Sequence, residues 1–543
     1  MEPLSPSAHQ DTFPRDSLPP RREWPELVFG PPELRYPRRL NCAEELLDGT
    51  IARFDPRRPA LYDAAGRVWS YGQLREHVDR IARVLTEDHG LVPGNRVLLR
   101  GPNSPWLAAC WLAVLKAGGV AVTTMALLRA GELRAIATAA RVGLALCDER
   151  FTGELERAGL PELRIVGFGD GADGELNRCA AGKATGFTAV PTAADDVALI
   201  AFTSGTSGRP KATMHFHRDV LAIADTFSAH VLRPRPDDLF AGSPPLAFTF
   251  GLGGLLVFPL RAGASALLLE SASPEKLFGA VGRHRVTVLF TAPTAYRAVL
   301  PQIDGHDLRS LRRCVSAGEP LPAETWHAFE RATGLRIIEG IGSTEMLHVF
   351  ISAADDDIRP GVTGRPVPGF RARVVDEAGA PLPDGVPGRL AVQGPTGCRY
   401  LSDERQRSQV QHGWNITGDI FVRDADGYFH YQARADDMIV TAGYNVAAPE
   451  VERAVVRHPA VRDCGVVGVP DPERGQVVKA FVVLAPDVGP SPQLALGIQD
   501  FVKSEIAPYK YPRQVEFVTA LPFGDTGKLQ RQVLRASLTA NGE

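Results

Sequence analysis

The chain has 543 residues and a mass of 58.6 kDa, which allows about three or four domains of ordinary size. Hydrophobic residues make up 44% and charged residues 23% of the sequence, and these ordinary values exclude a globally disordered chain. The net charge of −3 offers no basic excess for nucleic-acid binding. Only 8 of the 60 basic residues are lysines, so each lysine is of interest as a functional candidate.

The seven cysteines are scattered and form no C-x-x-C pair, so we expect free thiols and neither a disulfide framework nor a structural zinc site. The start of the chain, MEPLSPSAHQDTFPRD, carries acids and lacks the apolar core of a secretory signal. The longest uncharged run, residues 239–260, contains three prolines and four glycines, which disfavour a spanning helix. These features predict a soluble protein of the cytoplasm.

Residues 1–40 hold nine prolines, which predicts an extended arm lying over a domain. Helical and strand-like segments alternate after the arm. Residues 71–90 have apolar side chains at helical spacing, and residues 95–100 resemble a short buried strand. The remaining segments of this kind are a helix and strand at 106–123 and strands at 197–203, 264–269, 286–291 and 311–318. The alternation predicts an α/β fold with parallel sheets covered by helices.

The pattern changes after about residue 360. Residues 371–394 contain two β-rich runs joined by turns with glycine and proline, which indicates an antiparallel or barrel-like section. From about residue 437 a compact unit of roughly 105 residues begins, the size of an independent α+β domain. We therefore expect an arm (1–40), a large domain (41–435) and a small mobile domain (436–543).

A polar segment directly follows the apolar strand of residues 197–203. Its nine residues are Thr203, Ser204, Gly205, Thr206, Ser207, Gly208, Arg209, Pro210 and Lys211. Hydroxyl groups, glycines that allow close approach of the backbone, and a lysine together suit a polyphosphate. The segment is not a Walker loop, because two residues separate Gly208 from Lys211 and Ala212 follows the lysine.

The segment resembles the phosphate loop of the adenylate-forming superfamily, which comprises acyl-CoA synthetases, carrier-protein adenylation domains and firefly-type luciferases. Further signatures stand in the family's order: Ser-Ala-Gly-Glu-Pro at 316–320, Gly-Ser-Thr-Glu at 342–345, Thr-Gly-Asp at 417–419, Arg-Ala-Asp-Asp at 434–437, Gly-Tyr-Asn at 443–445 and Gly-Lys at 527–528. The ordered set is far more specific than any one motif. It implies an AMP-forming acid–thiol ligase that uses ATP, Mg²⁺ and coenzyme A.

The resemblance assigns each motif a part of the nucleotide site. Thr344 is expected near the α-phosphate and Glu345 near the magnesium ion that neutralises the phosphates. One carboxylate, that of Asp419, can accept both ribose hydroxyls. The residues assigned to adenine and ribose are Gly318, Glu319, Pro320, Asp419 and Arg434.

The C-terminal motifs imply a change of domain orientation between two half-reactions. By resemblance, Lys528 bridges the substrate carboxylate and the α-phosphate during adenylation, where a compact ammonium can hold two anionic oxygens. The small domain then rotates about a hinge at Asp436 and presents Gly443 and Tyr444 to the incoming thiol of coenzyme A. Lys510 is interpreted only as a surface or nucleotide-proximal residue.

Two segments, 245–252 and 339–348, are expected to line the acyl pocket. The residues concerned are Ala247, Phe248, Phe250, Ile341, Gly342 and His348. Many relatives carry histidine at the position of Phe248 and an aromatic residue at that of Ile341, and the version here is similar to benzoate- and 2-aminobenzoate-CoA ligases. An apolar slot suits a flat aryl carboxylate but discriminates ring substituents weakly.

Alternative functions remain at this stage. A stand-alone adenylation enzyme that loads an aryl group onto a carrier protein would share the first half-reaction, and a nucleotide-binding scaffold without catalysis would share the motifs. No membrane or nucleic-acid partner is expected, and a homodimer is compatible with the sequence. Two competing motifs are interpreted as structural: the G-x-G-x-x-A segment at 167–172 as a loop, and His215 with His217 as residues with local hydrogen bonds.

Overall fold

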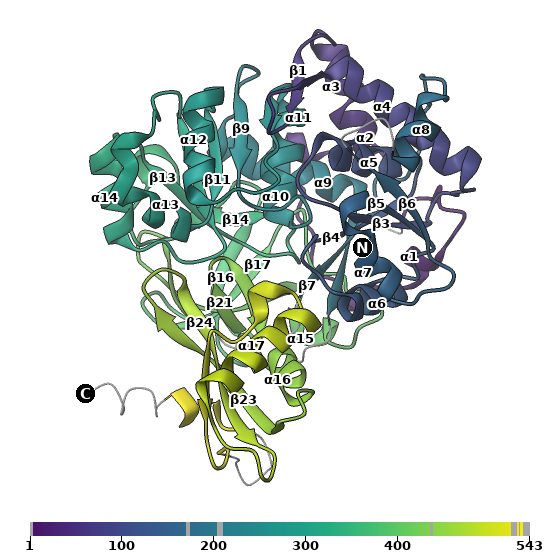
Figure 1. Cartoon of the computed structure of the whole chain (residues 1–543). Helices are drawn as coiled ribbons and strands as arrows, with labels where there is room; N and C mark the ends of the chain where they lie inside the picture. The colour runs from purple at the N-terminus through teal and green to yellow at the C-terminus, as the bar shows by residue number, and fades with distance from the viewer. Residues whose placement is uncertain are drawn as a thin grey trace.

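The computed structural model describes residues 4–169, 174–203, 210–434, 438–522, 529–531 and 533–535. Within these residues the strands form four sheets, three in a large N-terminal domain and one in a small C-terminal domain. Figure 1 shows the N-terminal domain, coloured purple to green, above the yellow C-terminal domain. The predicted α/β class is confirmed, including parallel sheets, an additional antiparallel sheet and a small α+β domain.

The first sheet has the strand order β6-β5-β3-β4-β7-β8 and is parallel except for its last pair. Its strands are β3 (Arg96–Arg100), β4 (Val120–Thr124), β5 (Leu144–Asp148), β6 (Arg164–Phe168), β7 (Val197–Thr203) and β8 (Lys211–Phe216). All five residues of β3 are buried, as expected for a strand inside a parallel sheet with both faces covered. The predicted strand 197–203 coincides with β7.

The second sheet has the order β15-β14-β13-β12-β11-β9-β10-β1-β2, with a parallel centre and antiparallel edges. Its strands are β1 (Pro59–Tyr62), β2 (Val68–Ser70), β9 (Leu239–Gly242), β10 (Ser265–Leu267), β11 (Val288–Thr291), β12 (Arg313–Ala317), β13 (Ile337–Gly342), β14 (Val349–Ser352) and β15 (Arg365–Pro366). The carboxyl ends of β9, β12 and β13 lead into the segments that the sequence assigns to adenine and the acyl group. Ligands bind at such strand ends in α/β folds.

Helices surround these two sheets in Figure 1. They are α1 (Phe13–Asp16), α2 (Cys42–Leu46), α3 (Asp48–Arg53), α4 (Tyr71–Arg83), α5 (Pro105–Lys116), α6 (Ala130–Ala139), α7 (Thr152–Arg157), α8 (Glu175–Ala181), α9 (His217–Ile223), α10 (Thr249–Leu252), α11 (Phe258–Ala262), α12 (Pro274–His284), α13 (Pro293–Val299) and α14 (Ala323–Thr333). The short helix α15 (Gln406–Gln409) packs instead against the antiparallel third sheet. The helix predicted over 71–90 begins at a capping box between Ser70 and Gln73 and buries Leu74, Val78 and Ile81.

The third sheet is antiparallel and follows the change of sequence pattern after residue 360. Its strands are β16 (Arg371–Val375), β17 (Gly388–Gln393), β18 (Val410–Gln411), β19 (Trp414–Arg423) and β20 (Phe429–Arg434). The antiparallel section predicted for 371–394 is therefore confirmed as β16 and β17. In Figure 1 this sheet lies between the two larger sheets and the C-terminal domain.

The C-terminal domain consists of one sheet with a helical face. Its elements are β21 (Met438–Thr441), β22 (Tyr444–Ala447), α16 (Ala448–Val456), β23 (Val461–Asp471), β24 (Gly475–Leu484), α17 (Pro492–Glu505) and β25 (Gln514–Phe517). Val451 of α16 and Ile498 of α17 share an apolar cluster with the strands. A second cluster contains Leu521 together with Phe481 of β24, and the half-buried Leu529 packs against it.

One prediction needs adjustment. The N-terminal arm is not uniformly extended, because it contains the one-turn helix α1 and packs Trp24 against Phe216, with ring centres 5.6 Å apart. The G-x-G-x-x-A segment, interpreted as a loop, begins in β6, and its residues 170–172 lie outside the described residues. The short helix α8 begins later, at Glu175, and its Asn177 donates a hydrogen bond to the carbonyl oxygen of Gly169 at 2.8 Å. A seven-residue helix of this kind gains its stability from packing, which sequence periodicity does not report.

Candidate active site

The predicted phosphate-binding motif lies at the end of a β-hairpin. Strands β7 and β8 are antiparallel, and Thr203 pairs directly with Lys211. The hairpin therefore holds the two ends of the motif side by side, while Ser204, Gly205, Thr206, Ser207 and Gly208 lie outside the described residues. The Lys211 ammonium nitrogen stands 5.4 Å from the centre of the Tyr400 ring, an arrangement that favours a cation electrostatically.

Tyr400 connects this lysine to the predicted magnesium ligand. Its buried hydroxyl donates hydrogen bonds to Glu345 Oε1 at 2.6 Å and to Gln409 Oε1 at 3.2 Å. Burial and the negative charge of Glu345 raise the pKa of Tyr400 far above its usual value, so the hydroxyl stays protonated and acts as a donor. The structure thus brings Lys211 and Glu345 to the two sides of one tyrosine.

The loop that carries Thr344 and Glu345 is fixed from beneath by β8. The His215 ring nitrogen Nε2 lies 2.8 Å from the carbonyl oxygen of Thr344. The amide of Leu347 donates to the same oxygen at 3.1 Å, and Leu347 adopts a left-handed conformation with φ of 68°. The predicted local role of His215 is therefore a bond that positions the phosphate-side loop. His217 contacts Cys42, whose sulfur lies 3.2 Å from Nδ1.

A buried ion pair supports the same region. Arg399, which precedes Tyr400, is fully buried and pairs with Asp219 of α9. Burial raises the pKa of the Asp219 carboxyl, but Arg399, His215 and Arg218 together lower it more, so the carboxyl remains ionised. Arg399 also lies 4.0 Å above the ring of Phe216 at the end of β8. The Arg399 Nε donates to the carbonyl of Met214 in β8 at 3.3 Å, and the Arg399 carbonyl accepts from the Met214 amide at 2.8 Å. These bonds hold the segment before Tyr400 against the strand that carries Lys211.

The predicted ribose residues meet across two strands. Asp419 of β19 pairs directly with Arg434 of β20, so the backbones of the two residues lie side by side in the sheet. Asp419 is 6% exposed, and its amide donates to the Thr417 hydroxyl at 3.3 Å. The backbone of Arg434 is described, whereas its side chain lies outside the described part of the structure.

The predicted adenine segment follows β12 and faces the C-terminal domain. A side chain at Gly318 would approach the carbonyl oxygen of Gly443 to 3.9 Å. A side chain at Gly443 would lie 3.7 Å from Glu319 Oε1. Burial raises the pKa of Glu319 to about 7, although the Gly443 backbone and Arg297 oppose the shift. Residues 318–320 and 443 therefore lie in one place, although they come from different domains.

The acyl segment is held at a fixed distance from β3 and β4. Asn103 accepts a hydrogen bond from the amide of Leu246 at 2.7 Å and donates to the carbonyl of Pro244 at 3.0 Å. The Thr123 hydroxyl donates to the carbonyl of Ala247 at 3.2 Å. These side-chain contacts place Phe248 at the start of α10 without a regular strand or helix before it.

Four rings, including that of Phe250 in the acyl segment, pack together, and we refer to this cluster as the floor of the predicted acyl pocket. The His348 ring lies 5.6 Å from that of Phe250, 4.6 Å from that of Phe258 and 5.3 Å from that of Phe227. Burial lowers the pKa of His348 to about 3, so the ring is neutral. Gly253 allows this packing, because a side chain there would come within 2.4 Å of the imidazole. His348 is thus part of the floor, whereas Phe248, Phe250 and Ile341 are half-buried nearer the surface.

The C-terminal domain presents Tyr444 to the acyl segment. The ring centres of Tyr444 and Phe248 are 6.1 Å apart, and Tyr444 stacks on Tyr509 at 4.2 Å. Gly443 adopts φ of 80°, a conformation that favours glycine, and its Cβ position would lie 3.5 Å from Ala292. The predicted thiol-side residues 443 and 444 are therefore in contact with the N-terminal domain.

Other assigned residues lie outside the described structure. Lys528 and Asp436 belong to this group, in addition to the central residues of the phosphate loop. The seven cysteines all lie within the described residues and are free thiols. No helix among the described residues is long and apolar enough to cross a membrane.

Comparison with known proteins identifies the class to which this site belongs. The family model of AMP-binding enzymes matches residues 50–400, and the model of the AMP-binding enzyme C-terminal domain matches residues 450–528. The chain belongs to the AMP-binding, adenylate-forming enzyme family. It is an AMP-forming acid–thiol ligase of the aryl-CoA ligase group, whose members use ATP, Mg²⁺ and coenzyme A.

Individual relatives cover nearly the whole chain. The benzoate–CoA ligase of Thauera aromatica is 34% identical, over 93% of this chain and 98% of its own. The crystal structure of the anthranilate CoA ligase AuaEII in complex with anthranoyl-AMP is 35% identical, with a TM-score of 0.72 over 93% of this chain and 99% of its own. The amide bond synthetase McbA from Marinactinospora thermotolerans is 29% identical, with a TM-score of 0.81 over 92% of this chain and 99% of its own.

Proposed function

We propose that this protein joins an aromatic carboxylate of the 2-aminobenzoate or benzoate type to coenzyme A through an acyl-adenylate, with release of pyrophosphate and then AMP. The observation that carries the proposal is the ring cluster of Phe227, Phe250, Phe258 and neutral His348 below the acyl segment. Aromatic rings pack well against a flat apolar substrate in offset or edge-on arrangements. The similarity to benzoate– and anthranilate–CoA ligases supports the same substrate class.

The neutral state of His348 matters for the choice of substrate. An imidazolium in this floor would attract carboxylates, whereas a neutral ring leaves the slot apolar and directs the substrate carboxylate toward the phosphate side. Phe248 and Ile341 are half-buried and suit the walls of such a slot. A slot of this kind distinguishes an aromatic ring from a flexible chain better than one ring substituent from another.

Lys211, Thr344 and Glu345 are proposed to receive the phosphates of ATP, with Glu345 as the magnesium ligand. The fit of Mg²⁺ to this site rests on Tyr400, whose hydroxyl donates to Glu345 Oε1 at 2.6 Å. This hydrogen bond fixes the position of the Glu345 carboxylate. A hard oxygen donor suits Mg²⁺, which typically binds through one or two carboxylates together with substrate phosphates. When bound, the ion neutralises charge on the phosphates.

The reaction requires no nucleophile from the enzyme. In the first step a substrate carboxylate oxygen forms a bond to the α-phosphorus of ATP, and the bond to the pyrophosphate oxygen breaks. In the second step the sulfur of coenzyme A bonds to the carbonyl carbon, AMP leaves, and the thiol proton is released. The residues of the chain bind and orient the substrates and screen their charge. Positioning and electrostatic stabilisation are therefore the main contributions of the protein to this transfer.

We propose that the chain divides into an arm (1–40), a large domain (41–435) and a C-terminal domain (436–543), and that Asp436 is the hinge between the last two. Gly443 and Tyr444 contact the N-terminal domain, and Leu521 and Leu529, on either side of position 528, belong to a cluster formed by the C-terminal domain alone. These contacts suit the orientation for thiol attack. Lys528 acts, in this proposal, in a second orientation that serves adenylation.

The proposed function is tested by identifying the acyl product that the enzyme forms with different acceptors. The full chain is incubated with ATP, Mg²⁺, 2-aminobenzoate or benzoate, and one acceptor at a time: coenzyme A, a pantetheinylated carrier protein, or a primary amine. The proposal expects an aryl-CoA thioester as the main product. Transfer to the carrier protein alone would indicate a loading enzyme, and failure to release pyrophosphate with any acid would indicate a nucleotide-binding scaffold.

An amine acceptor defines a second candidate function, because the amide bond synthetase has a TM-score of 0.81 with this chain. An amide as the main product would favour that activity. The acid specificity of the pocket is the same in both cases. We propose a cytoplasmic location, where ATP and coenzyme A are supplied. We also propose a homodimer, which size-exclusion chromatography with light scattering tests.

A further inference from the structure

A buried lysine of the C-terminal domain forms ion pairs that cross the domain boundary. The Lys510 ammonium lies 2.6 Å from Glu132 Oε1 of α6 and 2.7 Å from Glu450 Oε1 of α16. Lys510 is 4% exposed. Burial lowers the pKa of Lys510, but Tyr509 and the two carboxylates raise it more, so the lysine remains charged in this environment.

Glu132 makes a second contact across the same boundary. Its Oε2 accepts a hydrogen bond from the amide of Ala507 at 3.1 Å, in the turn that precedes Lys510. The same oxygen accepts from the amide of Arg129 at 2.9 Å and so caps the start of α6. One carboxylate of the N-terminal domain therefore fixes both a backbone group and a side chain of the C-terminal domain.

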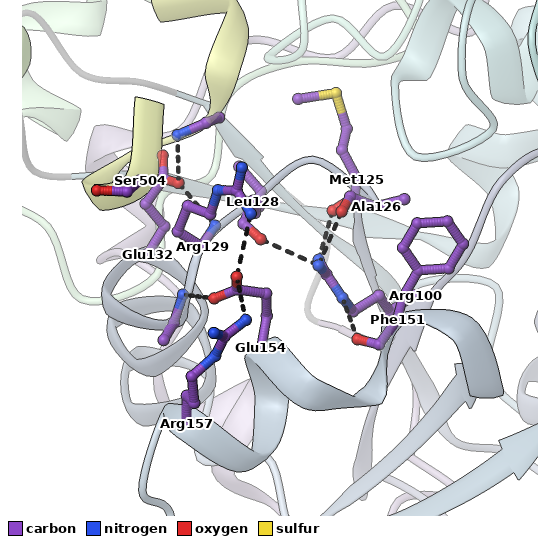
Figure 2. Close-up of polar contacts among 12 residues, drawn as sticks. Arg100, Met125, Ala126, Leu128, Arg129, Glu132, Phe151, Glu154, Arg157 and Ser504 are labelled. Carbon is purple, nitrogen blue, oxygen red and sulfur yellow. Dashed lines mark hydrogen bonds and ion pairs between the residues drawn. The ribbon is translucent and has the colours of Figure 1, made fainter. Parts of the chain in front are cut away.

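The N-terminal side of this contact is rigidly built. Figure 2 shows Glu132 and Arg129 beside the segment 125–128, next to the yellow C-terminal domain that carries Ser504. Arg100, which is fully buried, donates to the carbonyls of Met125 at 2.6 Å, Ala126 at 2.8 Å and Leu128 at 3.0 Å. In addition, Glu154 accepts hydrogen bonds from the Arg129 side chain and from the amide of Ala130, at 3.1 and 3.0 Å. Glu132 is therefore presented from a fixed turn.

The C-terminal side connects the contact to the acyl pocket. Tyr509, adjacent to Lys510, stacks on Tyr444 with 4.2 Å between ring centres, and Tyr444 meets Phe248 at 6.1 Å. A rotation that withdraws Tyr444 from Phe248 carries Tyr509 and Lys510 with it, because all three residues belong to one packed domain. The ion pair and the thiol-side face therefore engage the N-terminal domain together.

We infer that Glu132, Lys510 and Glu450 form a reversible latch that holds the C-terminal domain in the orientation for thioester formation. The latch is a set of positioning residues, since none of them contacts the acyl segment. The inference rests on the proposed function, in which two domain orientations alternate. A buried ion pair suits this task, because the gain from pairing and the loss of hydration nearly balance, so the contact can open in every turnover.

The latch is tested by separating the two half-reactions in the full chain. Glu132→Gln keeps one oxygen as the acceptor for the amides of Arg129 and Ala507, and its NH2 group then replaces the charged oxygen that faces Lys510. The variant therefore removes the ion pair and leaves the backbone contacts in place. We expect thioester formation from supplied aryl-adenylate and coenzyme A to slow by about tenfold or more, the range of a hydrogen bond to a charged group. Pyrophosphate release in the absence of thiol should be unchanged or faster.

Three further variants sharpen the result. Lys510→Met should reproduce the selective loss, and Lys510→Arg should retain most of the activity because a guanidinium can still bridge two carboxylates. Lys503→Met is the matched control, since Lys503 is exposed and pairs with Asp500 in its own helix at 2.8 Å. This control should leave both half-reactions unchanged.

Hydrogen exchange of the Ala507 amide gives a readout without substrates. In the wild type its bond to Glu132 slows exchange, and in Lys510→Met the peptide that contains Ala507 should exchange faster, while peptides from β23 keep their wild-type rates. Unchanged exchange, or equal loss of both half-reactions in Glu132→Gln, would overturn the latch. If no aryl acid releases pyrophosphate but Ala507 exchange still responds, the proposed function fails and the domain contact stands.

Discussion

The contact between Tyr400 and Glu345 gives the sharpest prediction for the nucleotide site. Tyr400→Phe removes one hydroxyl and keeps the ring that lies 5.4 Å from the Lys211 ammonium. The lost bond is 2.6 Å long and joins a buried donor to a carboxylate. A residue that orients a metal ligand in this way typically changes metal affinity by about 10–100-fold, so we expect the Mg²⁺ concentration for half-maximal pyrophosphate release to rise by about that factor.

The assay varies Mg²⁺ at saturating ATP and aryl acid and follows pyrophosphate. Tyr428→Phe is the control, because the Tyr428 hydroxyl also donates one hydrogen bond, to the carbonyl of Asp357 at 2.9 Å, but lies outside the assigned site. The control should keep the wild-type Mg²⁺ dependence. If Tyr400→Phe folds normally and also keeps the wild-type dependence, Tyr400 does not position the magnesium ligand.

Three further predictions address ATP binding, stability and domain rotation. Asp419→Ala should raise the KM for ATP, with a loss of about 1.5–3 kcal/mol for each charge-assisted bond to ribose; an unchanged KM would exclude that role. The buried His348 has a pKa of about 3 against 6.5 when unfolded, so the unfolded chain binds the extra proton and folding stability falls as pH drops below 6.5. Denaturant titrations at pH 7 and pH 5 measure how much unfolding free energy each protein loses in acid. The loss should be about 2 kcal/mol smaller in His348→Phe than in the wild type, and an equal loss would contradict the burial argument. Lys528→Ala should abolish aryl-adenylate formation and spare thioester formation from supplied adenylate, whereas Asp436→Pro should do the reverse; equal loss of both steps in both variants would rule out domain alternation.

The sequence was informative wherever a motif is local. The strand 197–203, the hairpin motif that follows it and the paired positions Asp419 and Arg434 could be placed from short segments. The partner strand β8 was harder to assign, because five of its six residues are buried and the alternation that marks a half-buried strand is missing. Its residue His215 was expected to make a local hydrogen bond, but the partner, the carbonyl of Thr344, is 129 residues away in the chain.

The residues that the sequence did not identify act through long-range contacts. Tyr400 lies in no recognised motif, and its role depends on Glu345, 55 residues earlier in the chain. Lys510 was interpreted as a surface or nucleotide-proximal residue, but it is buried, and its partner Glu132 lies 378 residues away. Only the folded chain brings such charges together. The scarcity of lysine, with 8 in the chain, was the one signal that pointed to Lys510.

The central claim is that the pocket selects an aryl carboxylate, and the most direct measurement is kcat/KM for different acids under identical conditions. Benzoate, 2-aminobenzoate, 2-hydroxybenzoate, hexanoate and acetate are compared by pyrophosphate release in the presence of coenzyme A. The account predicts that an aryl acid has the highest value, with small differences among the three ring substituents. A higher kcat/KM for hexanoate or acetate than for benzoate and 2-aminobenzoate would contradict it.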